Sequence, residues 1–251
     1  MKGKGKLGPL SVIGVVRELR RRGGDPRPLS VAGARELVPI LARELRAGGE
    51  ASAVVENVLE NVSVLVWVGE PDAEQLQKAD QAGVPIVAVT DADVVPYVLA
   101  TSIVRVPPGQ GFPVDEIARA VASKLGEDGT ALAARLPVVR AAVCAQLIAA
   151  FSKRNAIVAG AVFVPGVDMP ILTLNQVRLV LRIALAYGET IDNQRALELL
   201  GVVGAGFGFR AVARELLDFV PVAGWALKAS VAYAGTRAIG EAAVRYFEAR
   251  R

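Results

Sequence analysis

The sequence contains no histidine and only one cysteine, Cys144, among its 251 residues. Histidine is the side chain that most often serves as a general base near neutral pH, and it is the commonest metal ligand. Its absence excludes Ser-His-Asp and Cys-His catalytic arrangements within this chain. Cys144 has no partner for a disulfide or a zinc site and lies in an apolar run, so we expect a buried, inert thiol. The sequence thus predicts no resident metal or cofactor, and its cysteine content is compatible with the cytoplasm.

A phosphate-binding loop is missing from the place where it would follow the first expected strand. If the loop began at Gly33, the pattern G-x-x-x-x-G-K-[ST] would require Gly, Lys and Ser or Thr at the next fixed positions. The chain has Val38, Pro39 and Ile40 there, and Pro39 has no backbone N–H to donate to a phosphate. Glu36, in the middle of this segment, would repel one. We therefore expect no nucleoside triphosphate hydrolysis and, more broadly, no enzymatic activity.

Long apolar runs are also missing, although 53% of the residues are hydrophobic. A membrane-spanning helix needs about 18 or more consecutive apolar residues. The charge-free stretches Asn155–Val167 and Leu199–Phe209 are shorter than that. Because such stretches lie close together in the second half of the chain, both a helical bundle and a membrane-embedded hairpin stay open as interpretations.

Residues 28–126 contain short apolar runs that alternate with helical segments. Strands are expected at Pro28–Val31, Ala51–Val55, Ser63–Val68, Pro85–Val89 and Ser102–Val106, and helices at 33–46, 73–82 and 113–125. Continuously apolar strands that alternate with helices predict a short, mostly parallel sheet with flanking helices. In such a sheet the ligand crevice lies at the carboxyl ends of the strands.

Four carboxylates are expected near those strand ends, namely Glu70, Asp72, Asp91 and Asp93. Asp93 stands where the guanine-reading Asn-Lys-x-Asp motif of a G domain would place its last residue, but the Asn and Lys of that motif are absent. If the four side chains gather at the crevice, they form a weak Mg²⁺ or ligand site. The alternative is that they are surface carboxylates and helix caps.

Residues 130–251 read as an apolar helical bundle, joined to the first half by a linker at Gly126–Gly129. Helices are expected at Leu132–Ser152, Met169–Tyr187, Asn193–Leu200, Phe207–Asp218 and Ala223–Phe247. Their polar residues form narrow stripes, which is typical of helices buried on most sides. Small residues recur at helical spacing in Ala232, Thr236 and Gly240, which predicts close packing of helix backbones, either in a membrane or in a soluble bundle.

Positive charge is concentrated at the N-terminus. Residues 1–27 contain eight Lys or Arg and two acidic residues, a net charge of +6, so the remaining residues sum to −2 for a total of +4. Residues 10–22 fit an amphipathic helix that ends in Arg20, Arg21 and Arg22, as in a helix at an anionic membrane surface. The alternative is a solvated tail followed by a helix docked on the sheet. Interleaved aromatic residues are absent, so we expect no nucleic-acid binding.

From about Arg135 to Ala243 the chain resembles the YcjF-like, GTPase-associated helical family. The resemblance lies in NAIVAGAVFVPGVDMPILTLNQ (155–176), RIALAYGE (182–189) and the run from Leu199 to Ala242. Members of this family look like inner-membrane or membrane-associated proteins whose helical domain often follows a G domain. The preceding half of this chain would then be a degenerate G-domain-like α/β domain without phosphate or base signatures. The resemblance implies no catalytic residues.

The sequence predicts three segments: a basic arm with an amphipathic helix (1–27), an α/β domain (28–126) and an apolar helical domain (130–251). We expect a non-enzymatic module that associates with a membrane, at its cytoplasmic face, or with another protein, a GTPase or a second copy included. A ligand- or nucleotide-binding α/β protein and a homo-oligomeric scaffold are the alternatives. The residues expected to carry interactions or packing in the helical half are Pro165, Asp168, Pro170, Arg178, Arg182, Gly204, Gly208, Pro221, Gly224 and Gly240.

Overall fold

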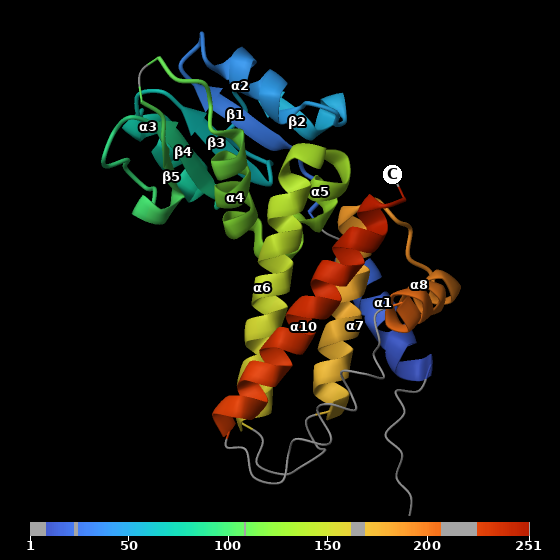
Figure 1. Cartoon of the computed structure of the whole chain (residues 1–251). Coiled ribbons are helices and arrows are strands. Elements are labelled where there is room, and N and C mark those ends of the chain that lie inside the picture. Colours follow the sequence, from blue (N-terminus) through green and yellow to red (C-terminus); the bar gives the residue numbers. More distant parts are fainter. Residues whose placement is uncertain (1–8, 23–24, 108, 162–168, 207–224, 251) are drawn as a thin grey trace, which may run out of the picture. The chain divides into compact units, whose positions relative to one another are not determined.

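The computed structural model describes residues 9–22, 25–107, 109–161, 169–206 and 225–250 (Figure 1). The chain divides into two compact units. Residues 24–146 form what we call the α/β unit, and residues 1–23 together with 147–251 form the helical unit. The predicted fold class is confirmed, because a parallel sheet with flanking helices is followed by a run of helices.

The sheet of the α/β unit has five strands in the order β2-β1-β3-β4-β5, and every neighbouring pair is parallel. The strands are β1 (Leu29–Gly33), β2 (Val54–Glu56), β3 (Val64–Val68), β4 (Ile86–Thr90) and β5 (Ile103–Arg105). All residues of β3 and β4 are buried, as expected for strands covered on both faces. Of the predicted strand Ala51–Val55, only the end is extended, since residues 51–53 form a 3-10 turn.

Different helices cover the two faces of the sheet. One face packs against α3 (Ala73–Gln81) in a cluster that includes Trp67 and Leu76. Helices α2 (Val38–Leu45) and α4 (Val114–Leu125) also contact the strands but contribute nothing to that cluster, so they cover the other face (Figure 1). No α-helix connects β4 to β5. The loop between them carries only a 3-10 turn at Ala100–Ser102.

The predicted linker at 126–129 is instead a packed 3-10 helix of the α/β unit. A Cβ on Gly129 would lie 3.3 Å from a methyl carbon of Val143, so this segment has close neighbours. The helix predicted from Leu132 onward is interrupted, because α5 (Thr130–Arg135) ends before Pro137 and α6 (Pro137–Ala161) begins there. A residue before proline is pushed out of the helical region, and Leu136 is extended, with φ −121° and ψ 97°. The division between units lies inside α6, at residues 146 and 147.

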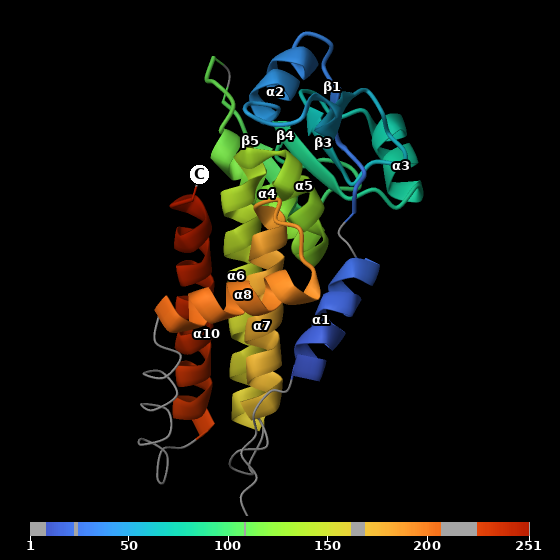
Figure 2. The ribbon, with the colours of Figure 1, turned by 90° about the vertical axis from the view of Figure 1, so that its right-hand side faces the viewer.

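The helical unit contains α1 (Pro9–Arg22), the second part of α6, α7 (Met169–Ala186), α8 (Asn193–Gly206) and α10 (Trp225–Glu248). Figure 2 shows α7 and α10 running along each other, with α8 across them and α1 beside α7. Two local predictions are confirmed. The Asp192 carboxylate accepts a hydrogen bond from the Arg195 backbone N–H at 2.7 Å at the start of α8, and Gly188 follows α7 with φ +82°.

Several predicted features lie outside the described residues. They are the helix at Phe207–Asp218 and the residues Pro165, Asp168, Gly208, Pro221 and Gly224. Among the described residues, no helix combines the length and the apolar character that crossing a membrane requires.

Candidate functional site

The strand order places the candidate ligand crevice between β1 and β3. The chain leaves β1 toward β2 on one side and leaves β3 toward β4 on the other, so the connections diverge at this pair. In open parallel sheets, ligands bind at such a switch point, outside the carboxyl ends of the strands. The loops after Gly33 and Val68 therefore decide whether a ligand can enter.

These two loops close directly on each other. The backbone N–H of Ala34 donates to the carbonyl oxygen of Val68 at 2.8 Å. Gly33 has φ +128°, and a Cβ at this position would lie 2.1 Å from the same carbonyl oxygen. A Cβ on Gly69 would lie 2.7 Å from the Cβ of Ala34. The base of the crevice is thus filled by backbone atoms, and glycine is required at both positions for this contact.

The start of α2 provides few backbone N–H groups that could bind a phosphate. The backbone N–H groups of Leu37 and Val38 both donate to the carbonyl oxygen of Ala34, at 2.9 and 3.0 Å, and Pro39 has none. The exposed Glu36 side chain adds negative charge beside this turn. Helix N-termini bind anions through amides that point at the ligand, and three successive positions of this turn cannot provide one.

The four carboxylates predicted at the strand ends do not form a cluster. Among the residues that the structure describes, no three His, Cys, Asp or Glu side chains are grouped as a metal ion would need. The side chain of Asp72 caps α3, because it accepts hydrogen bonds from the backbone N–H groups of Glu74 and Gln75 at 3.0 and 3.1 Å. The backbone hydrogen bond from Gln75 is the main reason why the pKa of Asp72 is lowered.

The carboxylate of Asp93 lies 2.5 Å from a guanidinium nitrogen of Arg105, and both side chains are largely exposed. Asp91 and Glu70 are also exposed, and the backbone carbonyl of Glu70 accepts a hydrogen bond from the Trp67 indole at 2.9 Å. These contacts agree with the interpretation of the four residues as surface carboxylates and a helix cap.

The loop between β4 and β5 exposes three large apolar side chains that sequence reasoning did not single out. Val94, Tyr97 and Leu99 are 80%, 49% and 68% exposed, while Val95 is buried on the α3 side of the sheet. Tyr97 has φ +63°, a backbone conformation that is uncommon for a residue with a large side chain. We call Val94, Tyr97 and Leu99 the apolar loop.

The polar stripe of α7, which consists of Asn175, Arg178 and Arg182, faces the other helices of the helical unit. Asn175 and Arg182 are buried, and the guanidinium of Arg178 donates to Asn175 Oδ1 at 3.3 Å. Asn175 Nδ2 in turn donates to the side-chain oxygen of Asn155 at 2.8 Å. Asn155 Nδ2 donates to the Thr236 hydroxyl, also at 2.8 Å. A buried hydrogen-bonded network therefore joins α6, α7 and α10.

The small-residue stripe of α10 packs tightly, as predicted. Thr236 and Gly240 are buried, and a Cβ on Gly240 would lie 2.6 Å from Ile148 Cγ1 and 3.1 Å from Leu179 Cδ2. Gly240 therefore belongs to a close contact of α10 with α6 and α7. Gly204 and Pro170 lie in α8 and α7 respectively.

The apolar face of α1 is covered by the helical unit. Val12, Val15, Val16 and Leu19 are buried, and α1 contacts α7 and α8. The prediction of an amphipathic helix is confirmed, and its buried face contacts α7 and α8.

Two polar contacts also fix α1. The carboxylate of Glu18 accepts hydrogen bonds from Nε and Nη2 of Arg178, at 3.2 and 3.0 Å. Nε of Arg20 donates to the carbonyl oxygen of Ile191 at 3.1 Å. Of the three predicted membrane-binding arginines, Arg20 is thus engaged within the protein, whereas Arg21 and Arg22 lie in the last turn of α1.

No protein-family model, curated protein or solved structure matches the chain.

Proposed function

We propose that this chain is a non-catalytic module that acts at an anionic membrane surface, with a degenerate, G-domain-like α/β unit. The observation that carries the proposal is the pairing of a basic N-terminus with an amphipathic α1. Residues 1–27 carry a net charge of +6 against −2 for the rest of the chain, so positive charge lies at one end of the sequence. An apolar helix face next to such charge is the usual makeup of a helix that binds a membrane interface.

The geometry of the switch point supports the non-catalytic part of the proposal. The backbones after β1 and β3 touch, and the amides of Leu37 and Val38 already donate to Ala34. A phosphate that needed the amides of Ala34, Leu37 or Val38 would have to displace these hydrogen bonds. We expect no rise in melting temperature when nucleotides are added with Mg²⁺, since a ligand that binds only the folded state must raise it. A clear rise would favour the ligand-binding alternative.

In this proposal the module acts at the cytoplasmic face of a membrane, where the lipid surface is negatively charged.

Flotation with lipid vesicles tests the proposal. The full-length protein should float with vesicles that contain phosphatidylglycerol, should not float with pure phosphatidylcholine, and should dissociate as salt is raised. Replacing Lys2, Lys4 and Lys6 by Gln should weaken binding by on the order of 100-fold, at about 1 kcal/mol for each charge near the surface.

A matched control removes three positive charges from the exposed surface of the α/β unit. Arg43, Lys78 and Arg119 are exposed, and their replacement by Gln changes the net charge by the same amount. Vesicle binding of this control should fall much less. Protein that stays entirely in the soluble fraction with anionic vesicles at low salt would rule the proposal out.

A second candidate function, self-association, is favoured by the apolar loop. Two large aliphatic side chains and a tyrosine are exposed within six residues. Exposed apolar side chains that lie together often mark a surface that a protein partner covers. If the loop joins two copies of the chain, mass measurement in the absence of detergent should give a dimer, and replacing Val94 and Leu99 by Ser should return it to the monomer mass. A monomer for the unmodified protein would dismiss this candidate.

A further inference from the structure

The α1 side chains that the structure describes as buried lie on one face, and the helical unit covers that face. The buried side chains Val12, Val15, Val16 and Leu19 lie on one side of the helix, while Gly14 and Arg17 on the opposite side are exposed. A helix that binds a bilayer interface buries its apolar face in the acyl boundary. The same face cannot be in contact with α7 and α8 and with lipid at once.

The docked position is held by a contact that opposes membrane binding. Glu18 is the only acidic residue in positions 1–22, and its carboxylate is bound by the guanidinium of Arg178 at 3.0 Å. Facing an anionic bilayer, Glu18 would be repelled, and it would lose this partner if α1 moved. Arg20, which would be attracted by the bilayer, donates instead to the Ile191 carbonyl.

We propose that α1 is an exchangeable membrane-binding helix: it leaves α7 and α8 when it binds an anionic bilayer and transfers the face made by Val12, Val15, Val16 and Leu19 to the lipid. This inference rests on the proposed function and adds the route by which binding occurs. The lipid surface is the occupant indicated by charge, because seven of the eight charged residues in positions 1–22 are basic.

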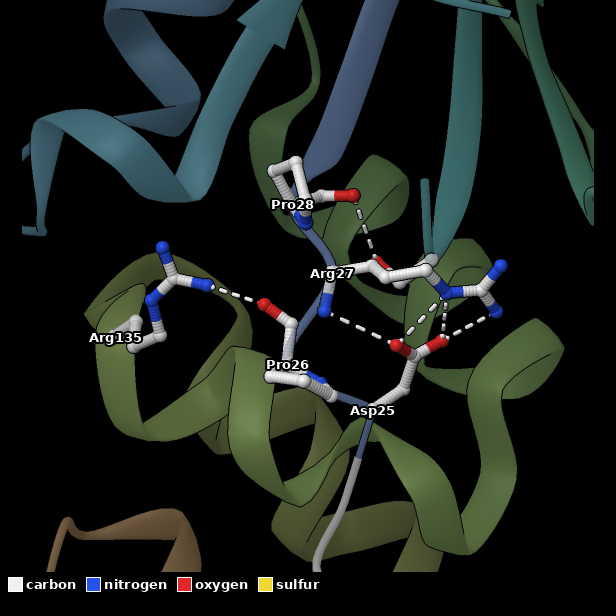
Figure 3. A network of polar contacts seen from close by, with 6 residues as sticks. Asp25, Pro26, Arg27, Pro28 and Arg135 are labelled. Carbon is white, nitrogen blue, oxygen red and sulfur yellow. Dashed lines mark hydrogen bonds and ion pairs between the residues drawn. The ribbon is translucent and has the colours of Figure 1, made fainter. Parts of the chain in front are cut away.

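Residues 25–28, which follow α1 in the chain, are held by hydrogen bonds within the α/β unit. The proposed movement of α1 therefore does not extend beyond them. The carboxylate of Asp25 accepts hydrogen bonds from the Arg27 guanidinium, the shortest at 2.6 Å, and this pairing is the main cause of the lowered pKa of Asp25 (Figure 3). Arg135 Nη1 donates to the carbonyl oxygen of Pro26 at 2.8 Å, as Figure 3 shows. The Ser63 hydroxyl donates to the carbonyl oxygen of Pro28 at 3.1 Å, so residues 25–28 are tied into the α/β unit.

Reversal of the charge at position 178 tests the exchange. In Arg178→Glu, two carboxylates face each other and docking is weakened, while α1 itself is unchanged. The fraction of molecules with a free α1 rises, and with it the apparent affinity for the bilayer. Binding to phosphatidylglycerol vesicles should increase at least about tenfold, although the net charge of the protein falls by two. Simple attraction between the protein and the lipid predicts the opposite change.

Two further variants separate exchange from other effects. Glu18→Arg combined with Arg178→Glu restores an ion pair in reversed order and leaves the net charge of the protein unchanged. The affinity of this double variant for the vesicles should therefore return toward that of the unmodified protein. Arg237 lies on α10 in an exposed pair with Glu241, so Arg237→Glu makes the same charge change away from the Glu18 contact. It should leave binding unchanged or weaken it. Far-UV circular dichroism and the melting transition show whether each variant is folded.

Hydrogen exchange measured on the unmodified protein gives an independent readout that does not depend on any variant. When vesicles are added, the amides at the beginning of α8, next to Ile191, should exchange faster because α1 no longer covers them. Vesicle binding without this change, or with unchanged affinity in Arg178→Glu, would overturn the exchange but leave the proposed function standing. Failure of both the unmodified protein and Arg178→Glu to bind vesicles would overturn both.

Discussion

Replacement of Gly240 by Ala should destabilise the helical unit although alanine is the better helix former. A methyl group at this position would lie 2.6 Å from Ile148 Cγ1 and 3.2 Å from Ile148 Cδ1, on α6, and 3.1 Å from Leu179 Cδ2, on α7. Carbon atoms in favourable contact are about 3.5–4.0 Å apart. The nearest of these atoms is the first carbon beyond Cβ of Ile148, so it cannot move away without a change of rotamer or a shift of the helix.

Two opposing terms set the size of the effect. In a helix interior, alanine is more favourable than glycine by about 1 kcal/mol of folding free energy. The overpacked methyl costs about 1–3 kcal/mol, as extra carbons do in well-packed cores. The expected net change is therefore a loss of about 0–2 kcal/mol in the free energy of unfolding, and comparison with a glycine that has no close neighbours isolates the overpacking cost.

Gly201 on α8 provides the matched comparison, because it is exposed and a Cβ there would have no neighbour within 4 Å. Gly201→Ala should gain only the propensity term, so the two variants should differ by about 1–3 kcal/mol, the overpacking cost alone. Urea unfolding followed by far-UV circular dichroism measures this difference. Equal stability of Gly240→Ala and Gly201→Ala would refute the close packing of α10 against α6 and α7.

Three other expectations follow from the structure. Gly33→Ala should lower the free energy of unfolding by more than about 3 kcal/mol and abolish folding of the α/β unit, because its Cβ would lie 2.1 Å from the Val68 carbonyl oxygen. Gly83 has φ +69° and no close neighbour, so Gly83→Ala should lower the free energy of unfolding by only about 1–2 kcal/mol. Urea titration of both variants checks this, and equal losses would contradict it. Thr236→Val should cost about 1–3 kcal/mol, since it leaves a buried amide without its hydroxyl acceptor, and an unchanged urea midpoint would argue against the network. The lowered pKa of Asp72 means that its charge stabilises the fold above the carboxyl pKa of the unfolded chain, about 3.9, and that this contribution is lost as pH falls through the lower folded value. Asp72→Asn keeps a cap that does not titrate, so the variant should be less stable than the parent at neutral pH and equally stable at the lowest pH values; a difference that does not depend on pH would contradict this.

Much of the α/β unit could be predicted because its signals are local. A continuously apolar run such as Pro85–Val89 has few stable places other than a strand covered on both faces, and it became β4 at residues 86–90. Pro39 removes an amide wherever the chain folds, so the loss of the phosphate loop was readable in advance. The interruption at Pro137 was equally local, and it was missed because the apolar spacing on both sides of it fits one long helix.

The carboxylates show why a candidate site is harder to predict than a strand. Their sequence positions at strand ends were correct, but the direction of each side chain depends on its nearest donor. The Asp72 carboxylate accepts hydrogen bonds from backbone N–H groups at the start of α3, and the Asp93 carboxylate forms an ion pair with Arg105. Closure of the loops after Gly33 and Val68 likewise depends on two segments that are 35 residues apart, by their sequence numbers, meeting across the sheet.

By itself the sequence determined the parallel sheet, the missing phosphate loop, the amphipathic character of α1 and the helix boundaries marked by Gly188 and Asp192. Each of these follows from the periodicity or backbone chemistry of neighbouring residues. Only the tertiary structure decided that α1 lies on α7 and α8, with Glu18 paired to Arg178, 160 residues away in sequence. The spacing of apolar residues predicts that one face of a helix is buried. That spacing is the same whether the face packs on another helix, on a sheet or in a lipid bilayer, so the sequence does not identify the partner.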